Sequence, residues 1–278
     1  LYLIIALSII LYVGIRDDIY IMSPWGKIFL QGIAITIILV PTDLILNDLY
    51  GFLGIYEIGF FIGYPLTLFI GVFMINSFNL IDGIDGLAGI MGIFMFCCFG
   101  LIFYVLNDLF LVYLIVTLIG SITGYLRFNL SSTKKVFMGD TGSLILGFLM
   151  FFYLLELINH RNFDQINFFM GMELSIWMGL LIFLYPILDS GTVFLSRVKN
   201  HKSPFSPDNS HIHHFLLRRY QSHILVSLIV FSYSFFSVLV NVLIVYFYPD
   251  TYNYSIPFYL FISFLGNFLW RRYSENNA

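Results

Sequence analysis

Residues 87–106 read LAGIMGIFMFCCFGLIFYVL and contain no charged side chain. A helix of about 20 apolar residues is long enough to cross the hydrocarbon core of a membrane. Similar stretches recur along the chain, of which 59% of the residues are hydrophobic and only 10% are charged. A soluble core of 278 residues could not bury so much apolar surface, so the sequence predicts an integral membrane protein with the lipid bilayer as its solvent.

The apolar stretches predict an all-α, polytopic helical bundle, because a chain in hydrocarbon must satisfy its own backbone hydrogen bonds. We expect about nine membrane-spanning helices within one membrane-embedded domain, residues 1–278. The first stretch is short and starts with Leu1 rather than Met, so we interpret the sequence as a fragment or a trimmed chain. The expected spans are 1–15, 28–46, 60–77, 87–106, 109–127, 143–158, 174–195, 224–247 and 256–270.

The distribution of basic residues predicts the orientation. If the first span runs from outside to inside, the loops at about 16–27, 77–86, 128–142 and 196–223 face the cytoplasm. All Lys and Arg residues except Arg161 then lie on the inner side, as the positive-inside rule requires. The formal net charge of −3 gives no reason to expect a nucleic-acid partner.

Acidic residues gather at the inner ends of these spans. Clustered carboxylates at a membrane surface can hold a divalent cation, and such a cation suits phosphate chemistry. In the first loop, carboxylates at a helix C-terminus are opposed by the helix dipole. They therefore predict a compensating cation, either Lys27 or a metal, although anchoring at the lipid headgroups is an alternative. The acids are Asp17, Asp18, Asp82, Asp85 and Asp140.

The second loop, NSFNLIDGIDGL at 76–87, places polar residues at a spacing of three. On a helix this pattern would lie along one face. Glycines after each acid allow the backbone to bend and a phosphate to approach its N–H groups. N-capping of the next helix by Asp85 is the structural alternative, and it accounts for one acid only. The polar positions are Asn76, Asn79, Asp82 and Asp85.

Two further loops complete the predicted site. In KKVFMGDTGS at 134–143, Asp140 precedes a span and is a third candidate ligand, or part of a simple cap and turn. The last loop carries HIHH at 211–214, with Arg218 one turn later, and basic groups of this kind suit nucleotide phosphates. A zinc site is the alternative, but hard Asp ligands favour Mg²⁺ or Mn²⁺. Asp189 closes the preceding span and is expected to hold one of these bases in place.

These four loops, in this order, resemble the polyprenyl-phosphate N-acetylhexosamine-1-phosphate transferases, also called glycosyltransferase family 4. The resemblance rests on NSFNLIDGIDGLAG, FMGDTGSLILG, SPFSPDNSHIHH, and the Asp17-Asp18 pair with Lys27 and Gln31. It covers most of the chain, from Asp17 to about Arg219. Because members of this family have ten or eleven spans, it also implies that about two N-terminal spans are missing here.

The resemblance implies a Mg²⁺-dependent (or Mn²⁺-dependent) enzyme of the bacterial cytoplasmic membrane with its active site facing the cytoplasm. It would transfer a sugar 1-phosphate from a UDP-N-acetylhexosamine to undecaprenyl phosphate and release UMP. PDNSHIHH is closer to the branch that starts O-antigen, common antigen and teichoic acid linkage units, so UDP-GlcNAc is the preferred donor. A transferase using UDP-MurNAc-pentapeptide is the alternative, and a homodimer is left open as the assembly.

The same resemblance assigns roles to the predicted residues. Asp140, with Asp82 or Asp85, would hold the metal, and Asp17 would act as a base or nucleophile. The remaining groups would bind nucleotide, sugar or phosphate. The full prediction is catalytic Asp17, Asp18, Asp82 and Asp85; substrate-binding Lys27, Asn76, Asn79, His211, His213, His214 and Arg218; and metal-binding Asp140 and Asp82.

Two other classes of membrane protein remain as alternatives. A transporter would carry ionisable residues near the middle of its spans, whereas these spans are nearly free of charge. A CDP-alcohol phosphotransferase would need one dense run of acids, whereas this chain distributes them over three loops.

Overall fold

The computed structural model describes residues 1–49, 54–160, 172–199, 201, 211–248 and 251–276. Within these ranges the regular elements are helices, apart from an isolated antiparallel bridge between Asp48 and Glu57. The all-α prediction is confirmed. The helices are α1 (Tyr2–Ile19), α2 (Pro24–Thr42), α3 (Gly59–Leu80), α4 (Leu87–Val105), α5 (Leu109–Asn129), α6 (Gly139–Ile158), α7 (Met172–Ile182), α8 (Leu184–Lys199), α9 (Ile212–Tyr220), α10 (His223–Phe247) and α11 (Tyr252–Asn276).

Among the described residues, six helices are long and apolar enough to cross a membrane: α2, α3, α4, α5, α6 and α10. The bent pair α7 and α8 would count as a seventh. The predicted spans 1–15 and 256–270 are also helical, but α1 ends with three charged residues and the apolar part of α11 is shorter, Tyr254–Leu269. The prediction of a polytopic membrane bundle is therefore confirmed.

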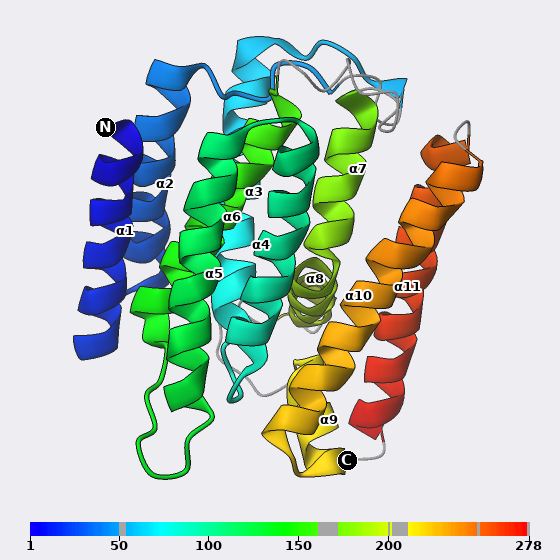
Figure 1. Ribbon diagram of the computed structural model, residues 1–278. Coiled ribbons are helices and arrows are strands. Elements are labelled where there is room, and N and C mark those ends of the chain that lie inside the picture. Colours follow the sequence, from blue (N-terminus) through cyan, green and yellow to red (C-terminus); the bar gives the residue numbers. More distant parts are fainter. Residues whose placement is uncertain (50–53, 161–171, 200, 202–210, 249–250, 277–278) are drawn as a thin grey trace.

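The predicted span 174–195 is not one straight helix. Ile176–Ile182 and Leu184–Lys199 meet at an angle of 76°. Pro186 explains the break, because it has no N–H to donate to the Ile182 carbonyl and its ring would clash there. As a result α8 runs across the direction of its neighbours and is seen nearly end-on in Figure 1.

Helix α6 lies at the centre of the bundle and contacts α1, α3, α4 and α7. Glycines allow the closest of these approaches. A Cβ on Gly14 of α1 would collide with the backbone of Thr141, and one on Gly147 of α6 would lie 2.9 Å from the Cα of Ile75 in α3. Small residues at such crossings are a common means of packing helices in membranes, where close van der Waals contact stabilises the pair.

The chain passes up and down through the bundle, so alternate connections meet at the same end (Figure 1). The C-terminal ends of α1, α3 and α5, the N-terminal ends of α2, α4 and α6, and helix α9 all lie at the lower end in this view. The described parts of the four loops predicted to share one side of the membrane are thus at one end of the molecule. Residues 200 and 202–210 of the last loop, including the prolines of SPFSPD, lie outside the described residues.

Candidate active site

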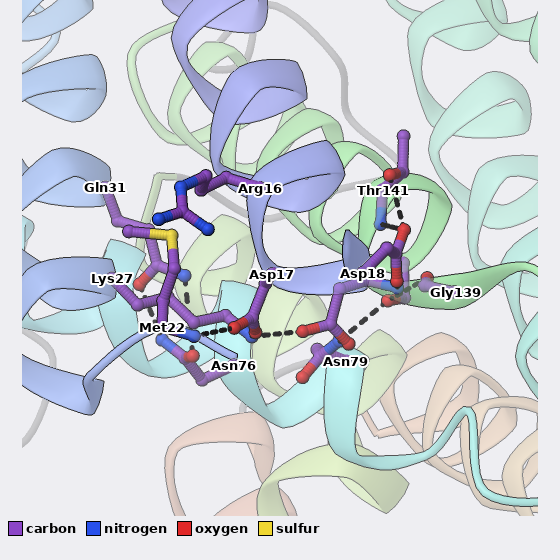
Figure 2. Close-up of polar contacts among 12 residues, drawn as sticks. Arg16, Asp17, Asp18, Met22, Lys27, Gln31, Asn76, Asn79, Gly139 and Thr141 are labelled. Atoms are coloured by element: carbon purple, nitrogen blue, oxygen red, sulfur yellow. Dashed lines mark hydrogen bonds and ion pairs between the residues drawn. The ribbon is translucent and has the colours of Figure 1, made fainter. Parts of the chain in front are cut away.

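Lys27 joins the first and third acidic loops. Its Nζ lies 2.8 Å from Asp17 Oδ2 and 2.6 Å from Asp140 Oδ2, and only 13% of its side chain is exposed. Lys27 is in the first turn of α2, and Ser23 begins that helix by accepting a hydrogen bond from the Gly26 amide. The compensating cation expected beside the α1 carboxylates is therefore Lys27, which the short connection between α1 and α2 brings back to them (Figure 2).

Asp17 is held in its ionised form. Burial alone would raise its pKa, but the hydrogen-bond network that it shares with Asp140, Lys27 and the Met22 amide lowers the pKa to about 2. The Met22 N–H donates to Asp17 Oδ1 at 2.7 Å. A carboxylate with so low a pKa is a poor proton acceptor at neutral pH.

The C-terminal part of α3 supplies two side-chain amides, Asn76 and Asn79, to the residues around Lys27 and Asp140. Asn79 Nδ2 donates to Asp140 Oδ1 and to Ser143 Oγ, each at 2.8 Å. One turn earlier, Asn76 Nδ2 donates to Oε1 of the fully buried Gln31 at 2.7 Å (Figure 2). The two Asn residues predicted to bind substrate thus orient other side chains of the site, and Asn79 fixes one oxygen of Asp140.

Asp18 has a different surrounding from Asp17. Its carboxylate accepts hydrogen bonds from the amides of Asp140 at 2.8 Å and Thr141 at 3.0 Å, and from the Thr141 hydroxyl. Helix α6 has no side-chain cap of its own at Met138, so a carboxylate from α1 satisfies its first N–H groups and faces the positive end of its dipole. These bonds lower the pKa of Asp18 against the opposing effect of burial.

This arrangement predicts a stability role for Asp18. Asp18→Ala should destabilise the protein by about 1–2 kcal/mol, the usual effect of losing a helix cap. The measurement is thermal unfolding in detergent, with Asp43→Asn as a control: Asp43 follows the C-terminal end of α2, and Asn tolerates its left-handed backbone. An unchanged melting temperature would contradict the capping role, and the predicted catalytic role of Asp18 would then gain weight.

Asp82 lies in the turns between α3 and α4, together with Asp85. Helix α3 ends at Leu80, so the idea that all four polar residues share one helix face is wrong: Asn76 and Asn79 are helical, and the two acids follow the helix. Among the described residues, the carboxylate of Asp82 has no hydrogen bond or ion pair. Burial, together with the charges of Asp140, Asp85 and Asp18, raises its pKa to about 7.

Asp85 is surrounded by basic groups. Its Oδ2 lies 2.6 Å from Lys135 Nζ and 2.8 Å from His223 Nδ1. Helix α4 begins after Gly86, whose φ of 83° is left-handed, and no side chain caps it, so the alternative of N-capping by Asp85 is wrong. The Gly86 amide instead donates to Asn129 Oδ1 at 2.7 Å. Sequence reasoning missed Asn129 and His223 as determinants of this loop.

The histidines are gathered by Asp189 of α8, which is fully buried. His211 Nδ1 lies 3.1 Å and His213 Nδ1 3.4 Å from Asp189 Oδ2, and the Ile212 amide donates to Oδ1 at 2.8 Å. The expectation that Asp189 holds a base of this loop is confirmed. The cluster adjoins the second acidic loop, because a Cβ on Gly83 would lie 2.6 Å from His213 Nε2.

The predicted substrate-binding residues of α9 and its N-cap differ in how far they are buried. His211 and His213 are buried, His214 is half-buried, and Arg218 is exposed with its guanidinium 4.7 Å from the centre of the Phe215 ring. Burial and the neighbouring His213 and His211 lower the pKa of His214 to about 4, so it is a neutral hydrogen-bonding group at pH 7. His214 and Arg218 are one turn apart and form the accessible part of this helix.

The acidic residues suit a Mg²⁺ ion whose remaining ligands are water and substrate phosphates. The described residues contain no set of three or more His, Cys, Asp or Glu side chains that forms a ready-made metal cage. Mg²⁺ is commonly bound through one or two carboxylates, waters and substrate phosphates. Asp82, which has no hydrogen bond or ion pair within the described part of the chain, and Asp140 offer such a pair of carboxylates, and their mutual repulsion would be relieved by a cation.

Comparison with known proteins identifies similar sequences among membrane sugar-phosphate transferases. A Salmonella typhi undecaprenyl-phosphate alpha-N-acetylglucosaminyl 1-phosphate transferase is 33% identical over 223 residues, covering 78% of this chain and 58% of the relative. The enzyme of that name from Escherichia coli O157:H7 is 30% identical, with 76% and 56% covered. A Bacillus subtilis protein named probable undecaprenyl-phosphate N-acetylglucosaminyl 1-phosphate transferase is 31% identical, with 82% and 61% covered. This chain thus spans somewhat more than half the length of these relatives.

The family relationship follows from a further match. The family described as Glycosyl transferase family 4 matches residues 1–158, more than half of the chain. This region contains Lys27 and all five acids of the site. The chain belongs to glycosyl transferase family 4.

Proposed function

We propose that this protein transfers a sugar 1-phosphate, most favourably GlcNAc 1-phosphate, from a UDP-sugar to undecaprenyl phosphate and releases UMP. The observation that carries the proposal is the meeting of Asp17 and Asp140 at Lys27, with Asn79 bonded to Asp140, at one end of a membrane bundle. The distribution of Lys and Arg supports a cytoplasmic location for this end. In bacteria the product would start a lipid-linked glycan of the cell envelope.

Asp140 and Asp82 would hold Mg²⁺ at this site. When bound, the ion would neutralise charge on the diphosphate of the donor. Asn79 already orients Asp140 through Oδ1, and Lys27 contacts Oδ2, so this carboxylate has a fixed direction. Asp85 is the alternative second ligand, and its Oδ2 is already engaged by Lys135 and His223.

The reaction needs positioning more than proton transfer. A phosphate oxygen of the lipid would form a bond to the β-phosphorus of the UDP-sugar, while the bond from that phosphorus to the bridging oxygen of UMP breaks. A lipid phosphate is mostly ionised at neutral pH and requires no base. The low pKa of Asp17 agrees with this route, in which Asp17 keeps Lys27 close to the reacting phosphates. An aspartyl-phosphate intermediate is the competing route, which would retain rather than invert the configuration at phosphorus.

A groove lined by α2 and α3 suits the isoprenoid chain of the acceptor. It has a volume of about 590 Å³ and an almost entirely apolar lining from α2 and α3. It begins at Trp25 and Ile28, which flank Lys27 in the sequence, and it continues along α2 to Ile37. A lipid in this groove would place its phosphate at the N-terminal end of α2, which carries Lys27. The lining residues are Trp25, Ile28, Phe29, Gly32, Ile33, Thr36, Ile37 and Leu68.

The donor sugar is supported by two independent features. The sequence HIHH differs from the three consecutive histidines expected of the pentapeptide-transferring branch. The relatives named above are called N-acetylglucosaminyl 1-phosphate transferases. The test supplies membranes carrying the protein with UDP-GlcNAc labelled with ³²P at the β-phosphate, together with undecaprenyl phosphate. Label in a chloroform-soluble lipid supports the proposal. A parallel assay uses UDP-MurNAc-pentapeptide labelled at the same phosphate. Lipid label from this donor alone would change the assignment of the donor.

Metal binding should release a proton. Because the pKa of Asp82 is about 7 in the metal-free protein, this carboxyl is mostly protonated at pH 6 and mostly ionised at pH 8. Mg²⁺ binds the ionised form, so its affinity should rise between these pH values as the competing proton is lost. Titration calorimetry at pH 6 in two buffers of different ionisation enthalpy measures the released protons. Asp82→Asn should abolish the release, and wild-type binding without proton release would contradict a role for Asp82 as ligand.

A further inference from the structure

We infer that Asp189 is a positioning residue that fixes the ring orientation of His211 and His213 and thereby supports the loop Ile81–Gly86. Asp189 lies on α8, three residues after Pro186 and just beyond the bend that turns this helix across the bundle. The bend therefore brings a fully buried carboxylate under α9. For its effect on turnover, this inference rests on the proposed function.

Asp189 caps the start of α9. His211 precedes this helix and provides no side-chain cap, and the amide of Ile212 donates to Asp189 Oδ1 instead. An uncapped amide at a helix start would otherwise lack a partner in this buried place. A negative charge here also faces the positive end of the helix dipole. Asp189 thus does for α9 what Asp18 does for α6: each caps a helix from a different element of the chain.

Asp189 also influences which ring nitrogen of the two histidines carries the proton. An ionised carboxylate only accepts hydrogen bonds, so a ring nitrogen that bonds to it must carry the proton. His211 and His213 both direct Nδ1 to Asp189 Oδ2, at 3.1 and 3.4 Å. The carboxylate therefore favours a proton on Nδ1 of His211, which makes the hydrogen bond, and on Nδ1 of the more distant His213, which the Tyr185 hydroxyl also contacts at 3.4 Å. The two rings stack with their centres 5.5 Å apart, which keeps them parallel.

The His213 ring lies against the acidic loop. His213 is fully buried, and its Nε2 has no hydrogen-bond partner among the described residues. The same atom lies 2.6 Å from the position that a Cβ on Gly83 would take, so the ring directs Nε2 at the backbone between Asp82 and Asp85. If Asp189 lost its charge, both rings could turn, and the support for this loop would change. A displacement of about 1 Å in a catalytic group can lower turnover about 10²-fold.

The experiment compares Asp189→Asn with the wild-type protein in membranes, after labelling of histidine with ¹⁵N. The chain has only six histidines, so solid-state NMR can resolve their ring nitrogens, and His211→Gln and His213→Gln assign the two signals. We expect Nδ1-protonated rings in the wild type and their loss in Asp189→Asn, with transfer activity about 10²-fold lower. Gly191→Ala is the matched control on α8, because a Cβ there would meet nothing within 4 Å.

The two readouts separate this inference from the proposed function. Wild-type rings protonated at Nε2, or rings unchanged by Asp189→Asn, would overturn the inference whatever the activity. Altered rings with full activity would also overturn it, because the orientation would then have no effect on the site. Altered rings in a protein that transfers no sugar phosphate at all would leave the orientation role supported and overturn the proposed function instead. If Asp189→Asn does not fold, Asp189→Glu, which retains the charge, should preserve Nδ1 protonation.

Discussion

Asp140→Asn is expected to lower the rate of sugar-phosphate transfer by about 10²- to 10³-fold, the range seen when a charge-stabilising group is removed from an active site. The substitution preserves the shape of the side chain but removes the negative charge that would bind Mg²⁺. Lys27 Nζ and Asn79 Nδ2 both donate to Asp140 in the wild type. In the variant, the NH₂ group of the new Asn side chain would face one of these two donors. The measurement is the initial rate of UMP release at equal amounts of folded protein in the membrane.

A matched control for Asp140→Asn is Glu156→Gln, which neutralises an acid at the opposite end of the same helix, α6. It should leave the rate within about twofold, since surface and remote changes rarely alter transition-state binding. Near-normal turnover of Asp140→Asn, with the protein folded, would remove Asp140 from the proposed metal site. A similar loss in both variants would indicate a general effect on α6 rather than a site effect.

Lys27→Met should abolish measurable transfer and also destabilise the protein. Lys27 is the cation between Asp17 and Asp140, and its removal leaves two carboxylates facing each other in a partly buried place. Loss of one partner from such a pair costs about 2–4 kcal/mol, because the remaining charge is uncompensated. Thermal unfolding in detergent measures the loss of stability, and UMP release measures the activity.

The double variant Lys27→Met with Asp17→Asn separates the two effects. Neutralising Asp17 removes most of the repulsion, so stability should recover, in a non-additive manner typical of contacting residues. Activity should not recover if Lys27 also binds phosphate. Recovery of both would show that Lys27 serves only to balance charge, and the proposed contact with the lipid phosphate would be wrong.

Much of the candidate site could be predicted from the sequence, because its polar residues lie in short loops of unusual composition. Acidic residues at the ends of apolar helices indicated Asp17, Asp82 and Asp140, and the up-and-down topology brings their loops together. The need for a cation beside the α1 carboxylates indicated Lys27, since the helix dipole opposes negative charge there. Local rules of this kind do not depend on how distant elements pack.

Other features depend on packing that local patterns do not encode. Asp17 and Asp18 are adjacent in the sequence, yet one binds Lys27 and the other caps α6, because successive residues on a helix point in different directions. Asn129 supports the Asp85 loop from the end of α5, which looked like an ordinary apolar span. The bend before α8 was different: Pro186 was visible in the sequence and could have predicted it.

The burial of the histidines also depends on tertiary packing. Spacing alone suggested that His211, His213 and His214 contact substrate alike. The bend at α8 places Asp189 beneath them, so two rings are buried against a carboxylate and only His214 is partly exposed. Direct contact of His211 and His213 with substrate remains a prediction, and the structure places His213 Nε2 beside Gly83 of the neighbouring loop.

The most direct test of the proposed reaction is UMP release by membranes carrying the protein, supplied with UDP-GlcNAc and undecaprenyl phosphate, with and without EDTA. The proposed function predicts UMP release that requires both the lipid phosphate and a divalent cation, is restored by Mg²⁺ after chelation, and is absent in Asp140→Asn. It also predicts one GlcNAc-carrying lipid for each UMP. No UMP from any UDP-N-acetylhexosamine, in protein shown to be folded, would contradict it.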